Sequence, residues 1–395
     1  MRPFPRSTSA ALPMPEPDAL AYSDALKNRI ADEIAAAGGW ISFARFMELA
    51  LYAPGQGYYS GGARKFGAAG DFITAPEMTP LFGQTLAVQA AQILRLSAPH
   101  IIEAGAGSGR LAVDLLLELE RLGAVPDSYG ILDLSGELRA RQRTTFEAHA
   151  PHLLERVYWL DALPERFDGL VLANELLDAM PVHLVVRDED GAIMERGVGF
   201  ENGGFAWCDH PAAGRVLERA EALAAECAMP PGYLSEINFA AAGWTASWAP
   251  ILGRGALLLI DYGFPRHEYY HPQRDMGTLM CHYRHHAHGD PFFLPGLQDI
   301  TAHVEFTAVV EAGHEAGLEF LGYTTQASFL LNCGVTDALA RIPVEDAGRY
   351  LPQSQAVQKL ISPAEMGELF KVMVLGKGVN EPLLGFLRGD RSATL

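Results

Sequence analysis

The sequence has few cysteines, no long apolar run and a deficit of basic residues. Four cysteines occur in 395 residues, and no two of them form a CxxC pair. This is too few for a disulfide framework, so we expect buried, reduced thiols. No apolar stretch reaches the roughly 18 residues that a transmembrane helix needs.

The charge balance also excludes classes of partner. Asp and Glu number 48 against 30 Lys and Arg, which gives a formal net charge of −18. A nucleic-acid binder normally carries a basic surface, whereas an acidic protein attracts cationic partners. Because 49% of the residues are hydrophobic, the chain is globular rather than disordered. We expect a soluble protein without a nucleic-acid or membrane partner.

The N-terminal part reads as a tail followed by helices and a loop. Residues 1–18 are rich in proline and lack the apolar core of a secretory signal, so we predict a disordered tail on a cytoplasmic protein. Residues 19–97 form a helical and lid segment in this interpretation, with one helix from about Ala19 and a second from Trp40 to Leu51. Within it, residues 52–71 are rich in glycine and aromatic residues, which is typical of a surface loop or of an active-site lid. A helix over 81–96 follows, with Thr79 as its N-cap.

Residues 98–395 alternate short apolar strands with helical stretches, which predicts a parallel α/β sheet. Two insertions interrupt this pattern, at about 182–250 and 265–310. The first holds an antiparallel hairpin around the Asp190-Gly191 turn and two helices, over 215–228 and 234–248. The expected strands are 100–104, 129–133, 156–160, 168–173, 255–261, 317–324 and 370–375.

The first strand runs directly into a glycine turn that contains Gly105, Gly107 and Gly109. Glycine adopts positive φ angles and lets a ligand approach the backbone closely. The following helix N-terminus favours anionic groups, and ligands bind at the carboxyl ends of strands in such sheets. The turn therefore predicts a nucleotide-like cofactor site, the alternative being a tight turn without a ligand.

The spacing in this turn selects among cofactors. A dinucleotide fingerprint needs a third glycine where this chain has Arg110, and a P-loop needs a GK[ST] sequence that is absent. The pattern is instead E-x-G-x-G-x-G, with Glu103 as the acid. It is similar to the first motif of S-adenosylmethionine-dependent methyltransferases.

Acids after the next strands extend the predicted cofactor site. Asp133 ends the second strand, where a carboxylate can accept hydrogen bonds from ribose hydroxyls; capping near Ser135 is the alternative. Asp161 follows the third strand and is a candidate acceptor for an adenine amino group. Trp159 beside it is either an adenine neighbour or a core residue.

An acidic turn follows the fourth strand. Asn174, Glu175 and Asp178 occur within ANELLDAMP, and a spacing of three would place both carboxylates on one face of a helical turn. Carboxylates can orient a guanidinium, whose donors form a fixed fork. These residues therefore predict the acceptor side, with a capping cluster as the alternative.

Several motifs together resemble the MidA family of S-adenosylmethionine-dependent methyltransferases, from about residue 22 to the C-terminus. The mitochondrial relative in that family is a protein arginine methyltransferase that acts on a complex I subunit and assists complex I assembly. The motifs are GYYS (57–60), GDFITAPEMTPLFGQ (70–84), EAGAGSGRLAVDLL (103–116), ANELLDAMPVH (173–183), IDYGF (260–264), GTLMCHYRHH (277–286) and PGLQDITAHVEFTAV (295–309).

The resemblance implies a Rossmann-like class I methyltransferase sheet that binds S-adenosyl-L-methionine. It implies that one set of residues holds or closes over the cofactor: Glu103, Gly105, Gly107, Gly109, Asp133, Gly70, Asp71, Phe72 and Thr74. It implies that a second set lines the acceptor side: Asn174, Glu175, Asp178 and Asp299.

The implied reaction is methylation of a protein arginine, with a respiratory complex I subunit as one candidate partner. Two other functions stay open, namely a non-catalytic assembly or scaffold protein on the same fold and an NAD-dependent dehydrogenase. The sequence leaves the oligomeric state open, a homodimer being one option.

The second insertion is rich in histidine, with four imidazoles at positions 282, 285, 286 and 288. Their spacing matches no HExxH or facial-triad pattern, so we expect no metal site, although a metal-binding loop and a loop that supplies a proton acceptor are alternatives. Asp299 and His303 are further candidates to face the acceptor, and the sequence does not select a general base.

Overall fold

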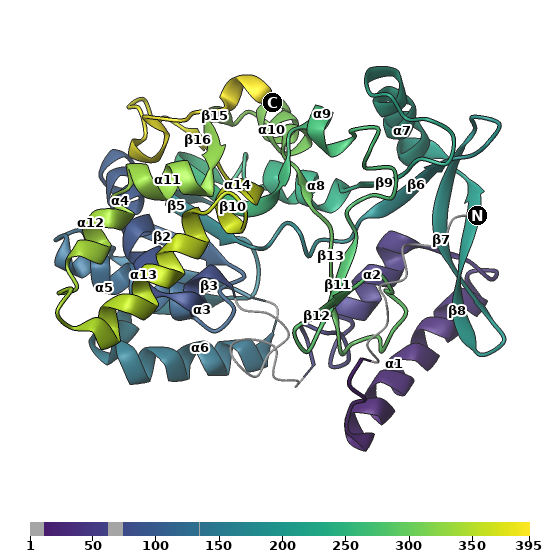
Figure 1. The fold of residues 1–395 in the computed structure, drawn as a ribbon, viewed down its shortest axis with the longest axis horizontal. Coiled ribbons are helices and arrows are strands. Elements are labelled where there is room, and N and C mark those ends of the chain that lie inside the picture. The colour runs from purple at the N-terminus through teal and green to yellow at the C-terminus, as the bar shows by residue number, and fades with distance from the viewer. Residues whose placement is uncertain (1–11, 62–73, 134) are drawn as a thin grey trace. The chain divides into compact units, whose positions relative to one another are not determined.

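The computed structural model describes residues 12–61, 74–133 and 135–395, and the chain forms two compact units (Figure 1). Unit 1 comprises residues within 1–72, 177–242 and 264–305. Unit 2 comprises residues within 73–176, 243–263 and 306–395. We expected one core with an N-terminal segment and two insertions. That division stays a prediction; in the structure, residues from that segment and from both insertions belong to unit 1, and the helix over 81–96 belongs to unit 2.

Unit 2 is built on a sheet with the strand order β15-β16-β10-β5-β2-β3-β4. Strands β10, β5, β2, β3 and β4 are parallel neighbours, whereas β16 is antiparallel to both β10 and β15. The chain enters at β2, adds β3 and β4 on one side, and then adds β5 and β10 on the other. The order thus reverses between β2 and β5, which is the point where open α/β sheets bind ligands. The Rossmann-like prediction is confirmed.

All seven predicted strands of this sheet are present. Their bounds are β2 (His100–Ala104), β3 (Ser128–Leu132), β4 (Val157–Leu160), β5 (Phe167–Asn174), β10 (Leu252–Phe264), β15 (Glu319–Thr325) and β16 (Phe370–Lys377). The helices of unit 2 are α3 (Ala75–Met78), α4 (Pro80–Leu96), α5 (Arg110–Arg121), α6 (Gly136–His149), α10 (Phe306–Glu315), α11 (Gln326–Asn332), α12 (Val335–Ala340), α13 (Ala347–Ile361) and α14 (Met366–Leu369). Short 3₁₀ helices lie at Pro151–Arg156, Leu384–Phe386 and Ser392–Thr394.

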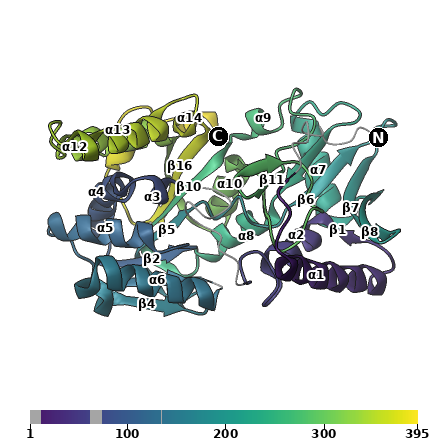
Figure 2. The ribbon, with the colours of Figure 1, turned by 60° about the horizontal axis from the view of Figure 1, so that its bottom comes forward.

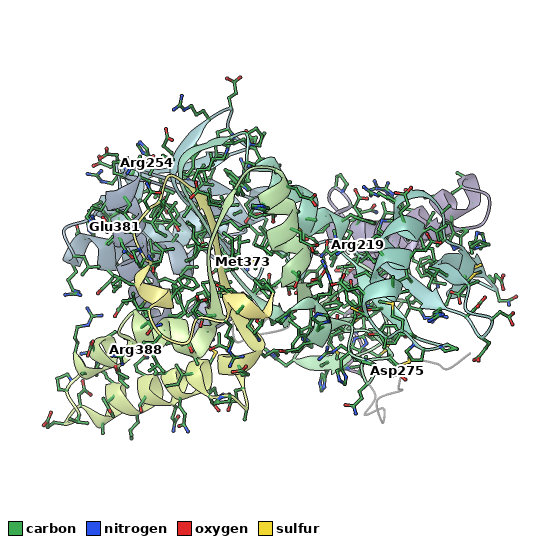
Figure 3. All side chains as sticks on the ribbon, turned by 90° about the horizontal axis from the view of Figure 1, so that it is seen from above. Arg219, Arg254, Asp275, Met373, Glu381 and Arg388 are labelled. Atoms are coloured by element: carbon green, nitrogen blue, oxygen red, sulfur yellow. The ribbon has the colours of Figure 1, made fainter. Side chains whose placement is uncertain are left out.

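Helices cover this sheet with their apolar faces. In Figure 2, α4 lies next to α5 and α5 next to α6. Thr79 caps α4 as predicted, because its hydroxyl accepts a hydrogen bond from the N–H of Leu81 (3.1 Å). Met373 of β16 is fully buried, whereas Arg388 is exposed near the C-terminus (Figure 3). Burial of such apolar side chains stabilises the layers by about 1.5–3 kcal/mol each.

Unit 1 contains an antiparallel sheet with the order β1-β7-β6-β9, in which β8 also pairs with β7. The predicted hairpin at Asp190-Gly191 joins β6 to β7. A small sheet, β12-β11-β13, lies in the histidine-rich insertion. The strands are β1 (Ile41–Ser42), β6 (His183–Arg187), β7 (Ile193–Glu201), β8 (Gly204–Pro211), β9 (Leu234–Ile237), β11 (Met280–Tyr283), β12 (His286–His288), β13 (Asp299–Thr301) and β14 (Val304–Glu305). The helices are α1 (Pro17–Ala36), α2 (Phe43–Tyr52), α7 (Gly214–Glu226) and α9 (Arg266–Tyr269), and α8 (Phe239–Ser247) begins in this unit.

Three local predictions were wrong where strand pairing or backbone strain overrides helix propensity. Leu234–Ile237 pairs with β6 and is a strand rather than the start of a helix. Ile41–Ser42 pairs with β7, so α2 begins at Phe43 instead of Trp40. Residues 175–180 form bends and turns, so Glu175 and Asp178 do not share a helical face. Among the residues that the structure describes, no helix is long and apolar enough to cross a bilayer.

Candidate functional site

The glycine turn between β2 and α5 has the conformation that its sequence requires. Gly105, Gly107 and Gly109 have φ angles of 71°, 53° and 81°, which only glycine adopts at little cost. The N–H of Gly105 donates to the carbonyl of Leu132 (3.0 Å), which ties the turn to the end of β3. A Cβ atom at Gly109 would lie 3.1 Å from Cα of Gln142, so α6 approaches the turn closely.

Side chains of neighbouring helices also hold this turn. The Thr145 hydroxyl on α6 donates to the carbonyl of Ser108 (2.8 Å). The Ser108 hydroxyl donates to the carboxylate of Glu77 on α3. Arg110, which replaces the third dinucleotide glycine, forms an ion pair along its own helix with Asp114 (2.8 Å). The turn is therefore fixed from α3, α5 and α6.

Asp133 lies at the carboxyl end of β3 and is 9% exposed. One carboxylate oxygen accepts the N–H of Ser135 (3.3 Å), and the other accepts the side-chain amide of Gln142 (2.9 Å). The capping interaction with Ser135 therefore exists beside the hydrogen bond from Gln142. The sequence did not single out Gln142, because a glutamine inside a helix carries no local signal.

Glu103 is the buried acid of the glycine motif. It is 2% exposed and accepts a hydrogen bond from the Tyr129 hydroxyl (2.7 Å). Burial raises the pKa of Glu103 to about 7, the Tyr129 hydrogen bond opposes this rise, and the negative charge of Asp133 adds to it. The two acids therefore lie within electrostatic reach of each other.

Glu103→Gln should remove part of the pH dependence of folding. The pKa of Glu103 is about 7 in the folded chain and near 4.5 in the unfolded chain. Its contribution to stability is therefore fully present below pH 4.5 and is lost as the pH rises through 7. Between pH 5 and pH 8, the unfolding free energy of the unaltered protein should fall by about 1–3 kcal/mol more than that of the variant. Urea titrations at both pH values measure this difference. The same pH dependence in both proteins would contradict the assignment.

Two predicted adenine neighbours lie on and after β4. The Asp161 side chain is 90% exposed and pairs with Arg139 (2.7 Å). Trp159 packs against the core of unit 2, and its indole N–H donates to Gln142 Oε1 (2.9 Å) while the Arg143 guanidinium lies 4.7 Å from its ring centroid. Trp159 is thus half-buried against the core with a polar anchor, and both it and Asp161 stay predicted cofactor neighbours.

Asn174 and Glu175 follow at the carboxyl end of β5. Glu175 has a φ of +50°, which is unusual for a residue other than glycine. Its N–H donates to the carbonyl of Ile260 (2.8 Å), and its carboxylate accepts the Asn174 amide (3.2 Å). The Asp261 carboxylate accepts the N–H of Leu176 (3.2 Å) and so supports this turn. Strain that the surroundings maintain is typical of functional sites.

The other two predicted acceptor residues belong to unit 1, where they cluster around a tyrosine. The Tyr59 hydroxyl lies 3.0 Å from both carboxylate oxygens of Asp299, which is 1% exposed. The pKa of Tyr59 lies well above its ordinary value. Burial is the largest cause, and electrostatic interactions with Asp299, Tyr52 and Asp178 add to it. Tyr59 therefore stays a neutral donor at physiological pH. The sequence indicated it only as part of the GYYS motif.

The remaining predicted residues have different outcomes. Gly70, Asp71 and Phe72 lie outside the described residues, as does most of the predicted lid. Thr74 is half-buried and stands at the N-cap position of α3.

The histidine-rich insertion forms a hairpin rather than a closed cluster. Arg284 and His285, both with positive φ, make the turn between β11 and β12. Burial lowers the pKa of His282 and of His288. Within residues 12–61, 74–133 and 135–395, no group of three or more His, Cys, Asp or Glu side chains is placed to hold a metal ion.

The residues of unit 2 fit S-adenosyl-L-methionine on chemical grounds. The turn offers bare backbone at a helix N-terminus, and the buried carboxylates of Glu103 and Asp133 suit a ligand with a cationic centre and ribose hydroxyls. In addition, Asn174 Oδ1 is buried and accepts no hydrogen bond from the described part of the chain. A buried acceptor of this kind normally has a donor, which a ligand can provide.

Comparisons with known proteins identify the same cofactor. The model of a family described as S-adenosyl-L-methionine-dependent methyltransferases matches residues 85–324, more than half of the chain. A COG1565 superfamily member from Burkholderia thailandensis, bound to S-adenosyl-homocysteine, is 56% identical, with a TM-score of 0.94 over 98% of this chain and all of that one.

Curated relatives are more distant. "Protein arginine methyltransferase NDUFAF7, mitochondrial" of Danio rerio is 28% identical over 85% of this chain and 83% of its own. The homologue of Drosophila melanogaster is 26% identical over 95% of this chain and 92% of its own. The chain therefore belongs to the family of S-adenosyl-L-methionine-dependent methyltransferases and is an enzyme that uses this cofactor as its methyl donor.

Proposed function

We propose that the enzyme methylates a guanidinium nitrogen of an arginine in a protein. The observation that carries this proposal is the Asn174-Glu175 turn, which holds a carboxylate in a strained conformation at the carboxyl end of β5, next to the strand that bears the glycine turn. A carboxylate pairs with a guanidinium through strong, directional hydrogen bonds. The names of the curated relatives support the same acceptor.

The roles of the residues follow from this assignment. The bound cofactor supplies an electrophilic methyl group on a sulfonium. Gly105, Gly107 and Gly109 would admit the cofactor to the backbone, Asp133 would accept hydrogen bonds from its ribose hydroxyls, and Glu103 would provide a buried carboxyl group near the end of β2. Glu175 orients the acceptor nitrogen, since alignment of two reactants supplies much of the rate in a direct displacement.

Further residues complete the proposed site. Asp178 and Asp299 of unit 1 keep their predicted role on the acceptor side, Asp161 keeps its predicted role at the adenine amino group, and Thr74 keeps its predicted role at the cofactor. The same role predicted for Gly70, Asp71 and Phe72 falls outside the described residues.

The proposed partner is a protein with an exposed arginine, and the family resemblance makes a subunit of respiratory complex I the first candidate. The curated relatives are named as mitochondrial proteins. The cytoplasmic location that the sequence suggested, like the homodimer, stays a prediction.

Cofactor-dependent melting separates the proposed enzyme from a dehydrogenase. At 100 times its dissociation constant, S-adenosyl-homocysteine should stabilise the folded state by about 2.7 kcal/mol. For a unit of this size, that corresponds to a rise in Tm of about 5–10 °C. NADH at the same concentration should leave Tm unchanged. A rise with NADH alone would favour the dehydrogenase.

The acceptor is identified by transfer of labelled methyl groups from S-adenosyl-L-methionine into a lysate, followed by mass spectrometry of the modified sites. Methylarginine in one or a few proteins supports the proposal. Label on lysine, on a carboxylate or on small molecules contradicts it while leaving the methyltransferase assignment intact.

A further inference from the structure

One side chain connects the carboxyl ends of three neighbouring strands in unit 2. Gln142 lies on α6 and is fully buried. Its amide nitrogen donates to the carbonyl of Gly107 (3.1 Å) and to Asp133 Oδ2 (2.9 Å), and its amide oxygen accepts the indole N–H of Trp159 (2.9 Å). It therefore contacts the glycine turn after β2, the acid after β3 and a side chain of β4.

Chemistry alone fixes the orientation of this amide. An indole N–H can only donate, so the amide oxygen faces Trp159. A backbone carbonyl and a carboxylate can only accept, so the nitrogen faces Gly107 and Asp133. Both amide hydrogens and the oxygen are then used, and the reverse orientation would place oxygen against two acceptors.

These hydrogen bonds determine two features that the cofactor site needs. Because the peptide group is planar and trans, fixing the carbonyl of Gly107 toward Gln142 directs the N–H of Ser108 to the opposite side of the turn. Because Gln142 and the N–H of Ser135 occupy different oxygens of Asp133, the carboxylate has one rotational position. A single amide thus sets the turn and the acid together.

We propose that Gln142 is a positioning residue of the cofactor site, which sets the affinity for adenosyl ligands by aligning the Gly107 peptide and the Asp133 carboxylate. The inference rests on cofactor binding and is independent of which acceptor is methylated. A positioning role differs from a purely structural one. If Gln142 were only structural, loss of its amide would lower stability and leave the binding of S-adenosyl-homocysteine unchanged.

A second buried glutamine serves as a matched control that separates loss of stability from loss of ligand binding. Gln89 on α4 is also fully buried in unit 2. Its amide nitrogen donates to Gln92 Oε1 (2.9 Å), and its oxygen accepts the N–H of Gly385 (2.8 Å), so its partners lie outside the site. Gln89→Leu and Gln142→Leu remove the same buried amide from the same unit.

Calorimetric titration of S-adenosyl-homocysteine into the full-length variants tests the proposal, and urea titration provides their stabilities. Gln142→Leu should raise Kd by about 10- to 100-fold, because it removes hydrogen bonds to a charged group and to the turn. Gln89→Leu should lose comparable stability and keep Kd within about threefold of the unaltered protein.

Gln142→Glu gives a second test, because it keeps the shape of the side chain and an oxygen that accepts the indole N–H of Trp159. It places an oxygen against Gly107 and Asp133, so Kd should rise at least as much as in Gln142→Leu. In an Asp133→Asn background, the effect of Gln142→Leu should shrink, since part of it acts through that carboxylate. A Kd within threefold in either folded Gln142 variant, or full additivity with Asp133→Asn, would overturn the proposal.

Discussion

Replacement of Gly107 by valine should abolish the binding of S-adenosyl-homocysteine, with a rise in Kd of at least about 100-fold. Gly107 has a φ of 53°, where a side chain costs about 1–2 kcal/mol and a β-branched one costs more. The turn would relax from this conformation and withdraw its carbonyl from Gln142, 3.1 Å away. Calorimetric titration with the same ligand measures the loss.

Gly123→Val provides the control for backbone strain. Gly123 follows α5 in the same unit with a φ of 69°, and a Cβ atom there would meet nothing within 4 Å. This variant should lose stability and bind the ligand normally. In cells, Gly107→Val should also lose biological function. Full biological function in a variant that cannot bind the cofactor would favour the scaffold alternative over the enzyme.

Glu175→Ala should lower the rate of methyl transfer by about 100-fold or more, the loss that misalignment of reactants typically produces. Its Kd for S-adenosyl-homocysteine should change by less than about threefold, because we assign Glu175 to the acceptor and not to the cofactor. Labelled-methyl transfer and calorimetry measure the two quantities. Equal losses in both would instead make Glu175 a cofactor ligand.

Glu175→Gly separates the carboxylate from the strain that holds it. Alanine and glycine both remove the carboxylate, but only glycine adopts a φ of +50° freely. The glycine variant should therefore be about 1 kcal/mol more stable than the alanine variant while being equally inactive. Activity that returned with glycine would show that the backbone conformation, rather than the carboxylate, is what catalysis needs.

Local patterns predicted the elements of unit 2 because its central strands, such as β5 and β16, are buried on both faces and read as continuous apolar runs. β2 has the predicted bounds, and the glycine turn has positive φ at all three motif glycines. Asp133 and Glu103 lie near strand ends as expected, and the structure shows both to be buried. These features depend on residues that are close together in the sequence, so the sequence carries them.

Other features depend on partners far along the chain. Ile237 pairs with His183, which turns a predicted helix start into a strand. Glu175 is held by the carbonyl of Ile260, 85 residues away, which prevents the helical turn that its spacing with Asp178 suggested. Tyr59 meets Asp299 across 240 residues.

By itself, the sequence determined the sheet, the cofactor and the family, since short-range periodicity, one glycine motif and a set of further motifs along the chain encode them. Only the tertiary structure decided the grouping into two units, the strained turn at Glu175 and the role of Gln142. A buried amide has no sequence signature, because its function depends on three acceptors and donors that folding alone brings to it.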